Sequence, residues 1–259
     1  MYCHPERSEF RQIHAETRAV EGPLPYLNSH PRLPFAVPTP KLTHVHPEPI
    51  ALQLAPFLQA SPGPGELSES LYIDISKYIN ILIRWNARIS LTAIRSPAEI
   101  ITRHFGESIF AARCLFPQPN PNTTLADLGS GAGFPGLPIK LYCPSLEVTL
   151  IESNQKKATF LREVIRTLAL TGIQVDATRA GSDAAPSHKF NLVTLRAVER
   201  FDQALPTAVS LTQPTGCLAL LIGSDQQTFA TKLAPQIQWQ KPIRLPLSKD
   251  RILLIGHKS

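Results

Sequence analysis

The spacing of apolar residues changes near residue 65 of this 259-residue chain. Residues 1–64 hold 12 of the 25 prolines and show no lasting period of 3.6 or 2.0. Proline fixes φ and removes a backbone donor, so neither helices nor strands extend through such a segment. The pattern therefore predicts a largely disordered extension over 1–64, interrupted by one short helix around Ile50–Gln59.

Beyond residue 65 the pattern becomes helical. Apolar residues recur every three or four positions over 67–83, which predicts an amphipathic helix that runs to about residue 85. The sequence Ser-Pro-Ala-Glu at 96–99 supplies an N-cap, a first-turn proline and an acid, so a second helix is expected to run to about residue 115. Gly106 inside this helix costs roughly 1 kcal/mol relative to alanine and can distort it locally. The two helices predict a small helical cap over 65–118.

Short apolar strands alternate with helical segments from residue 123 onward. Strands are predicted at 125–129, 147–152, 173–179, 191–197 and 216–223, with helices near 135–142, 154–170 and 201–211. Such alternation is typical of an α/β fold with a doubly wound, mostly parallel sheet. Two last strands, at 237–244 and 251–257, can pair as an antiparallel hairpin. Residues 119–259 are therefore predicted to form one Rossmann-like domain.

Charge and cysteine content narrow the classes of partner. The net charge is +6, and all of this excess lies in residues 65–259, which carry 21 basic and 15 acidic side chains. A basic folded region favours a polyanionic partner such as nucleic acid. The four cysteines, at positions 3, 114, 143 and 217, lack the spacing of a metal site and are interpreted as free thiols. No apolar run reaches the roughly 20 residues of a membrane span, so a cytoplasmic protein is expected.

The strongest motif is LADLGSGAGFPG at 125–136. A strand leads to three alternating glycines, Gly129, Gly131 and Gly133, which let the backbone turn tightly and approach a ligand. Pro135 suits the first turn of the following helix, whose free N–H groups attract negative charge. This arrangement of strand, glycine loop and helix predicts a ligand-binding loop.

Two kinds of ligand fit this loop. The glycines match the dinucleotide pattern GxGxxG, and Glu152 follows Gly131 by 21 positions. An acid at that place holds ribose hydroxyls of either a nicotinamide cofactor or S-adenosylmethionine, so the pattern does not separate them. Asp127, just before the first glycine, is typical of methyltransferases, and a carboxylate that caps the loop is an equally good interpretation.

Six sequence blocks recur in a characteristic order and spacing along residues 66–259. They are Trp85-Asn86, 91–95, Arg103-His104, 125–136, 149–164 and 195–198. Together they resemble the bacterial ribosomal RNA small-subunit methyltransferase G family, also called glucose-inhibited division protein B. The resemblance implies a class I S-adenosylmethionine-dependent methyltransferase that modifies N7 of guanine 527 in 16S ribosomal RNA. The implied partner is this RNA, the small ribosomal subunit or an assembly intermediate, and a monomeric enzyme is expected.

The resemblance also implies roles for single residues. The implied cofactor-binding residues are Gly129, Gly131, Gly133, Phe134, Glu152, Arg179, Ala180, Gly181 and Arg196. Among these, Glu152 would hold the ribose, and Arg196 matches the family's functional arginine and is the implied catalytic residue. The chain departs from the family pattern at Gly181, where an acid is usual, so contact there is limited to the backbone. A second departure is Glu107, which stands where the family has an aspartate.

Guanine N7 carries an in-plane lone pair and no proton, so its methylation needs positioning and exclusion of water more than a general base. Arg196 is expected to hold guanine O6 or a phosphate, and a structural salt bridge is its alternative role. A basic rim would bind RNA phosphates, with Arg95, Arg103, His104, Lys156, Lys157 and Arg162 as its members. For His104 the alternative is a buried hydrogen bond, and for the charged residues a solvated helix face. Because A-form RNA hides N7 in a deep, narrow groove, the target must be unpaired.

Two other functions remain open at this point. The glycine pattern also fits a dehydrogenase that uses NAD. The glycine at position 181 also fits a ribosome-binding module without catalytic activity.

Overall fold

The computed structural model describes residues 46–63, 65–117, 123–178 and 189–259. Its first elements are α1 (Pro47–Gln59), α2 (Glu69–Asn86), α3 (Pro97–Glu99), a π-helical segment (Ile100–Gly106) and α4 (Glu107–Leu115). The last three follow one another without a break and form one long helix. Both helices predicted for the cap are therefore confirmed.

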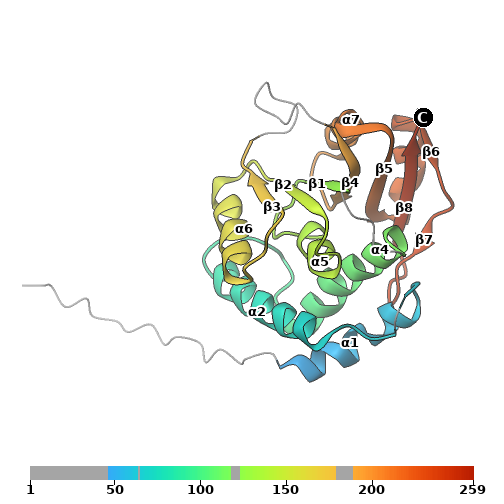
Figure 1. The fold of residues 1–259 in the computed structure, drawn as a ribbon. Helices are drawn as coiled ribbons and strands as arrows, with labels where there is room; N and C mark the ends of the chain where they lie inside the picture. The colour runs from blue at the N-terminus through green and yellow to red at the C-terminus, as the bar shows by residue number, and fades with distance from the viewer. Residues whose placement is uncertain (1–45, 64, 118–122, 179–188) are drawn as a thin grey trace, which may run out of the picture. The chain divides into compact units, whose positions relative to one another are not determined.

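Within the described residues, eight strands form one sheet (Figure 1). They are β1 (Thr124–Leu128), β2 (Glu147–Ile151), β3 (Ile173–Asp176), β4 (Phe190–Arg196), β5 (Thr212–Gly223), β6 (Ile237–Trp239), β7 (Ile243–Arg244) and β8 (Arg251–Lys258). Their order is β3-β2-β1-β4-β5-β8-β6, and β7 pairs with β8. Strands β1 to β5 pair in parallel and β8 is antiparallel to its neighbours. The predicted doubly wound sheet with a C-terminal antiparallel hairpin is confirmed.

Helices cover both faces of this sheet (Figure 1). The remaining helices are α5 (Gly136–Tyr142), α6 (Gln155–Thr167), α7 (Phe201–Leu211) and α8 (Gln227–Leu233). Helices α5 and α6 share one face with the cap, whereas α7 and α8 cover the other. Each face of the sheet therefore has its own hydrophobic core. Because side chains alternate along a strand, Leu192 of β4 packs in the core on the cap side and Val193 in the core beneath α7 and α8. Helix α8 was not predicted, since its seven residues show no clear helical period and, unlike those of the equally short α5, do not follow a recognised loop motif.

Helix α1 packs against the end of the π-helical segment. Phe57 lies so close to Gly106 that a Cβ there would be 2.5 Å from its ring. Ile50 and Leu54 are fully buried beside it. The short helix predicted within the N-terminal extension therefore forms, and it belongs to the packed core. The local distortion expected at Gly106 takes the form of the π-helical segment.

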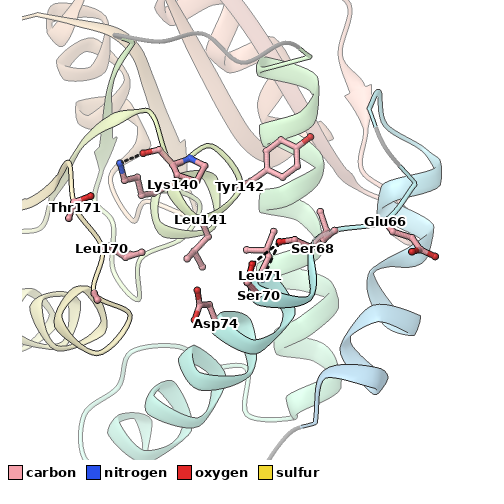
Figure 2. A pocket seen from close by; sticks show the side chains of 13 residues that line it. Glu66, Ser68, Ser70, Leu71, Asp74, Lys140, Leu141, Tyr142, Leu170 and Thr171 are labelled. Carbon is pink, nitrogen blue, oxygen red and sulfur yellow. Dashed lines mark hydrogen bonds between the residues drawn. The ribbon is translucent and has the colours of Figure 1, made fainter.

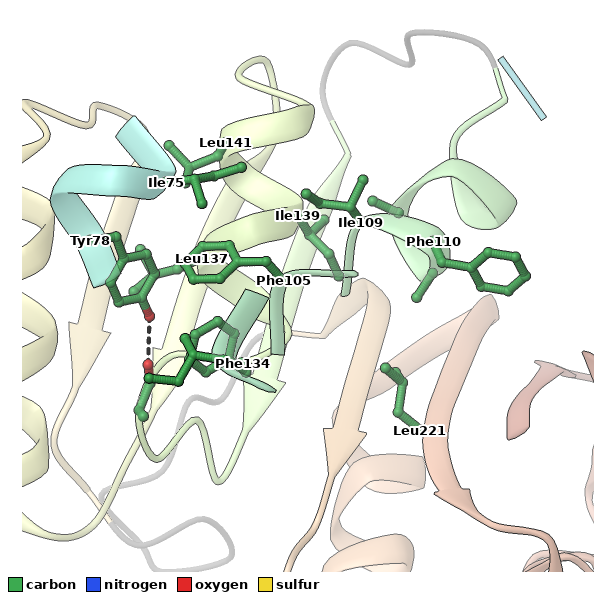
Figure 3. Packing of buried hydrophobic residues seen from close by; sticks show 14 of the residues in the cluster. Ile75, Tyr78, Phe105, Ile109, Phe110, Phe134, Leu137, Ile139, Leu141 and Leu221 are labelled. Carbon is green, nitrogen blue, oxygen red and sulfur yellow. Dashed lines mark hydrogen bonds between the residues drawn. The ribbon is translucent and has the colours of Figure 1, made fainter. Parts of the chain in front are cut away.

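Aromatic rings join the cap to the glycine loop (Figure 3). Tyr78 of α2 stacks on Phe134, with ring centres 5.4 Å apart and an interplanar angle of 3°, and Phe105 meets both rings edge-on. The buried Tyr78 hydroxyl donates a hydrogen bond to the carbonyl oxygen of Ala132. Burial, followed by the charge of Asp127, raises the pKa of Tyr78 well above its ordinary value. The cap thus supports the glycine loop from behind.

Candidate active site

The glycine loop leaves β1 and turns sharply at the edge of the sheet. Gly129, Gly131 and Gly133 have φ values of 72°, 57° and 87°, in the left-handed region that glycine tolerates. A Cβ at Gly129 would lie 3.0 Å from Cγ1 of Val198. At Gly133 a Cβ would be 2.4 Å from the Tyr78 hydroxyl oxygen. The first glycine therefore borders the open side of the edge, and the third is packed against the cap.

Glu152 follows β2 and reaches back to the glycine loop. Its Oε2 accepts the N–H of Gly131 at 2.8 Å, and its Oε1 accepts the N–H of Asn154 at 2.8 Å. Each carboxylate oxygen has a second acceptor direction, so Glu152 can still accept hydroxyl groups of a ligand. The spacing of 21 positions between Gly131 and Glu152 thus brings the acid and the loop together.

A cavity of about 200 Å³ opens where β1, β2 and β4 end. Its lining includes Gly129, Glu152, Thr178, Val198, Arg200 and Gln203. The chain runs from β1 toward β3 on one side of this point and from β4 toward β5 on the other. Ligands of open α/β sheets bind in the crevice at such a switch point. Among the described residues, the buried Thr178 hydroxyl has no hydrogen-bond partner, and a ligand would satisfy it.

A larger cavity, of about 430 Å³, lies at the opposite edge of the sheet (Figure 2). It is bounded by the start of α2, the end of α5 and the turn before β3. The Lys140 amine already donates to the carbonyl oxygens of Pro144 and Leu146. Asp74 already pairs with Lys77. Because these charges are used within the protein and the glycine loop is distant, the smaller cavity is the better candidate site.

Asp127 lies beneath the glycine loop and is 1% exposed. Its Oδ2 accepts the N–H of Gly136 at 3.1 Å, and its Oδ1 accepts the Thr194 hydroxyl at 2.8 Å. Burial raises the pKa of Asp127 to about 6, although these hydrogen bonds act in the opposite direction. This geometry fits the interpretation of Asp127 as a carboxylate that fastens the loop, and it joins α5 to β4.

Arg196 ends β4 inside a buried charge network on the cap side of the edge. Its Nη2 donates to Glu107 Oε2 at 3.1 Å and also to the carbonyl oxygen of Arg103. Its Nη1 lies 3.0 Å from Nδ1 of His104. Arg251 at the start of β8 holds Glu107 as well, with Nε 3.0 Å from Oε1. Burial lowers the pKa of Arg196 to about 10 against the opposing effect of Glu107, so the guanidinium stays charged at neutral pH.

The same contacts fix the tautomer and the protonation state of His104. A guanidinium only donates, so Nδ1 of His104 is the acceptor and Nε2 carries the proton, which it donates to Thr92 Oγ1 at 2.9 Å. Burial, then the charges of Arg196 and other arginines, lowers the pKa of His104 to about 2. The ring also stacks on Phe134 at 4.6 Å. His104 therefore makes the buried hydrogen bonds that were its alternative role, and Phe134 packs in this stack and does not line the smaller cavity.

The other predicted site residues lie in separate places. Arg95 and Arg103 are exposed on the cap, and Lys156, Lys157 and Arg162 belong to α6, where Lys157 is half-buried. Arg179, Ala180 and Gly181 lie outside the described residues, so their predicted cofactor contacts stay predictions. The structure adds Arg251 and Thr178, which no sequence motif marks, and Val198, which ends the block 195–198 but was given no role there.

The described part of the chain has neither a cluster of metal ligands nor a candidate membrane span. There, no group of three or more His, Cys, Asp or Glu side chains is placed as a metal would require. In the same residues, none of the helices has both the length and the apolar character to cross a bilayer.

Burial raises the pKa of Cys143 to about 11 and that of Cys217 to about 12, so both thiols are protonated at neutral pH.

The strand order and the site at its switch point define the fold of S-adenosylmethionine-dependent methyltransferases. Ribosomal protein L11 methylase from Lactobacillus delbrueckii subsp. bulgaricus shares this fold with a TM-score of 0.50 at 18% identity, over 61% of this chain and 79% of that one. Pyrococcus horikoshii TYW2, solved in complex with MeSAdo, has a TM-score of 0.51 at 14% identity, over 66% of each chain. These similarities concern the fold alone.

The sequence comparisons identify the family. The family model for rRNA small subunit methyltransferase G matches residues 72–249. The Ribosomal RNA small subunit methyltransferase G of Xylella fastidiosa strain 9a5c is 36% identical over 197 residues, which cover 74% of this chain and 90% of the relative. That of Chloroflexus aggregans is 37% identical over 199 residues, covering 73% and 82%. The chain belongs to the rRNA small subunit methyltransferase G family, as its sequence blocks predicted, and the cofactor of this class is S-adenosylmethionine.

Proposed function

We propose that this enzyme transfers a methyl group from S-adenosylmethionine to N7 of a guanine in 16S ribosomal RNA, at position 527 of that RNA. The observation that carries the proposal is that three buried acid or base side chains beside the loop, those of His104, Glu107 and Asp127, are already engaged. His104 uses both ring nitrogens, Glu107 holds two arginines, and Asp127 fastens the loop. A nucleophile with its own lone pair suits such a site, because no proton has to be removed before attack.

The smaller cavity fits the nucleoside part of the cofactor. A side chain at Gly129 would intrude beside Val198, and Glu152 keeps acceptor directions free for ribose hydroxyls. Thr178 adds a hydroxyl that has no hydrogen-bond partner within the described part of the chain. Bound S-adenosylmethionine supplies a methyl group on a sulfonium, and the chain's own task is to align that methyl with the base and exclude water.

Arg196 is proposed to hold the guanine through O6 or through a phosphate. Its guanidinium is charged, fixed by Glu107 and the Arg103 carbonyl, and lies 6.0 Å from the centre of the Phe134 ring. Three of its five N–H groups bind His104, the Arg103 carbonyl oxygen and Glu107, and among the described residues its buried Nε has no partner. A planar guanidinium suits the paired acceptors of guanine O6 and N7, and during transfer O6 alone remains available to it.

The test is transfer of tritiated methyl to small ribosomal subunits that lack this modification, and to 16S RNA extracted from them. Arg196→Lys keeps the charge but loses the planar fork, and it is expected to lower kcat/KM roughly a hundredfold through misplacement of the base. Arg166→Lys on α6 is the matched control, because Arg166 is exposed and, among the described residues, forms an ion pair only with its helix neighbour Glu163. Chain cleavage at N7-methylguanine locates the modified base. Transfer to another atom or another base would contradict the proposal.

The partner is proposed to be 16S RNA in a form that leaves the guanine unpaired. Initial rates on extracted RNA, on assembly intermediates and on complete subunits rank the possible partners. Sedimentation of the active enzyme tests the expected monomer.

A further inference from the structure

The turn between β7 and β8, residues 245–250, lies at the same edge of the sheet as Arg196. Strand β8 begins at Arg251, which pairs with Gly223 at the end of β5. Arg251 also binds Glu107, and Glu107 binds Arg196. One buried carboxylate therefore connects this turn to the residue proposed to hold the target base.

Hydrogen bonds hold the turn in one conformation. The N–H of Leu245 donates to the carbonyl oxygen of Arg251 at 3.0 Å, and the N–H of Ser248 donates to that of Leu245 at 3.3 Å. The N–H of Arg251 donates to Ser248 Oγ at 3.1 Å. The Leu245 side chain is 1% exposed and anchors the turn in the core. The residue at the tip, Leu247, is thus presented by a fixed backbone.

Leu247 has an exposure and a backbone conformation that are both unusual for leucine. Its side chain is 72% exposed, and its φ is 58°, in the left-handed region that residues with a Cβ seldom adopt. Exposed cations flank it at Arg244 and Lys249, and Arg244 Nη1 donates to the Lys249 carbonyl oxygen at 3.0 Å. An apolar contact between two cations offers surfaces for a base and for its neighbouring phosphates.

We propose that this turn contacts the RNA strand beside the target guanine, with Leu247 against a base and with Arg244 and Lys249 against phosphates. The inference rests on the proposed function. Enzymes that modify a base take it out of its stack, and apolar side chains such as leucine insert at the steps that open. The cations Arg244 and Lys249 outnumber the one exposed acid of the turn, Asp250, and this net positive charge favours RNA over a second copy of this chain.

Substitution of Leu247 is the direct test. Leu247→Gly removes the side chain and relieves the strain of a positive φ, so the fold is expected to persist. Leu247→Asn introduces a polar side chain of a residue type that tolerates the left-handed region. Both are expected to raise KM for small ribosomal subunits roughly tenfold, with the Kd for S-adenosylmethionine unchanged. Thr215→Gly is the matched control, since Thr215 is also exposed with φ of 63° but lies near the start of β5, at the opposite edge. Leu247→Met, which keeps an apolar side chain, is expected to retain most of the affinity.

Substitution of Lys249 tests the phosphate contact separately. Lys249→Gln is expected to reduce the slope of log Kd for RNA against log salt by roughly 0.7, the contribution of one phosphate contact to a single strand. Lys232→Gln on α8 is the control, because Lys232 is exposed on the opposite face of the sheet.

The outcomes separate this inference from the proposed function. If the unmodified enzyme transfers methyl and both Leu247 variants keep its KM, the inference is overturned and the proposed function stands. A cofactor Kd that rises together with KM also overturns it, because the turn would then support the cofactor site. If the unmodified enzyme transfers no methyl, the proposed function has failed. RNA affinity of the Leu247 variants, measured by filter binding, then decides the inference alone.

Discussion

The glycine-loop side of the sheet edge relies on backbone groups within one βαβ unit, whereas the Arg196 side relies on side chains from distant segments. Glu152 accepts the N–H of Gly131, and the two residues are 21 positions apart. On the cap side, Arg251 binds Glu107 across 144 positions, and Glu107 in turn binds Arg196. Both constructions meet at the ends of β1 and β4, which pair in parallel.

Because of this contrast, the two sides are expected to respond to different kinds of substitution. A backbone donor persists whatever side chain its residue carries, so the glycine-loop side depends on shape. A buried charge needs its partner, because an uncompensated charge in a low-dielectric interior is unfavourable. The glycine-loop side is therefore expected to respond most to added volume, and the Arg196 side to altered charge.

The largest effect is expected from Glu107→Gln. The substitution leaves Arg196 and Arg251 without their shared carboxylate, and loss of one partner from a buried ion pair costs about 3–5 kcal/mol. Urea denaturation measures this loss. Glu163→Gln is the control, because its pair with Arg166 is exposed and is worth less than about 1 kcal/mol. Equal losses in the two variants would remove the distinction between the two sides.

The dependence of stability on pH gives the next effect, with opposite signs on the two sides. The pKa of His104 is about 2 in the folded chain and 6.5 ordinarily, so the unfolded chain binds the proton first and stability falls as pH drops below 6.5. The pKa of Asp127 is raised from 3.8 to about 6, so its contribution rises as pH drops through that range. Each group changes the slope by at most about 1.4 kcal/mol per pH unit.

Denaturation between pH 4.5 and 7.5 checks these signs. His104→Gln is expected to lose stability less steeply on acidification than the unmodified chain, and Asp127→Asn more steeply. Slopes that do not change in either variant would show that the two groups titrate alike in the folded and unfolded chains.

Gly129→Ala tests the shape of the glycine-loop side. The alanine at position 129 must keep a left-handed φ, which costs roughly 1–2 kcal/mol. Its Cβ would also lie 3.0 Å from Val198 Cγ1. The Kd for S-adenosylmethionine, measured by calorimetry, is expected to rise at least about tenfold. Adding Val198→Ala separates the causes, because recovery of affinity implicates the side-chain contact and no recovery implicates the backbone. Gly65→Ala is the control, since nothing lies within 4 Å of its Cβ position.

The elements with long apolar patterns were predicted well from the sequence. The predicted helix over 67–85 is α2, and the predicted strands appear within a few residues of their expected places, except that the one expected at 237–244 is divided into β6 and β7. Helix α8 was missed because it is short and no loop motif marks its start, whereas the equally short α5 follows the glycine loop. The packing of α1 into the core could not be predicted from the sequence. It depends on Phe57 packing over Gly106, a contact between two segments that no local sequence pattern relates to each other.

The candidate site divides in the same way. The glycines and Glu152 follow from the geometry of one βαβ unit, so their spacing was informative. Arg251 carries no local signal, because only the pairing of β8 with β5 brings it to Glu107. The packing of the Phe134 ring between Tyr78 and His104 had no sequence signal, because those residues are 56 and 30 positions away. The predicted contact of Phe134 with the cofactor stays a prediction.

The smallest effect is expected at Tyr78, where the cap meets the glycine loop. Tyr78→Phe leaves the Ala132 carbonyl without its donor, which costs about 1 kcal/mol of stability by thermal or urea denaturation. Because the hydroxyl supports the loop from the side away from the smaller cavity, the Kd for S-adenosylmethionine is expected to change less than about twofold. Tyr72→Phe is the control, since the half-buried Tyr72 hydroxyl accepts only a long bond of 3.4 Å from the N–H of Leu67. If Tyr78→Phe instead weakens cofactor binding as much as Gly129→Ala, the cap and the loop act as one unit, and the division of the edge into two independent sides does not hold.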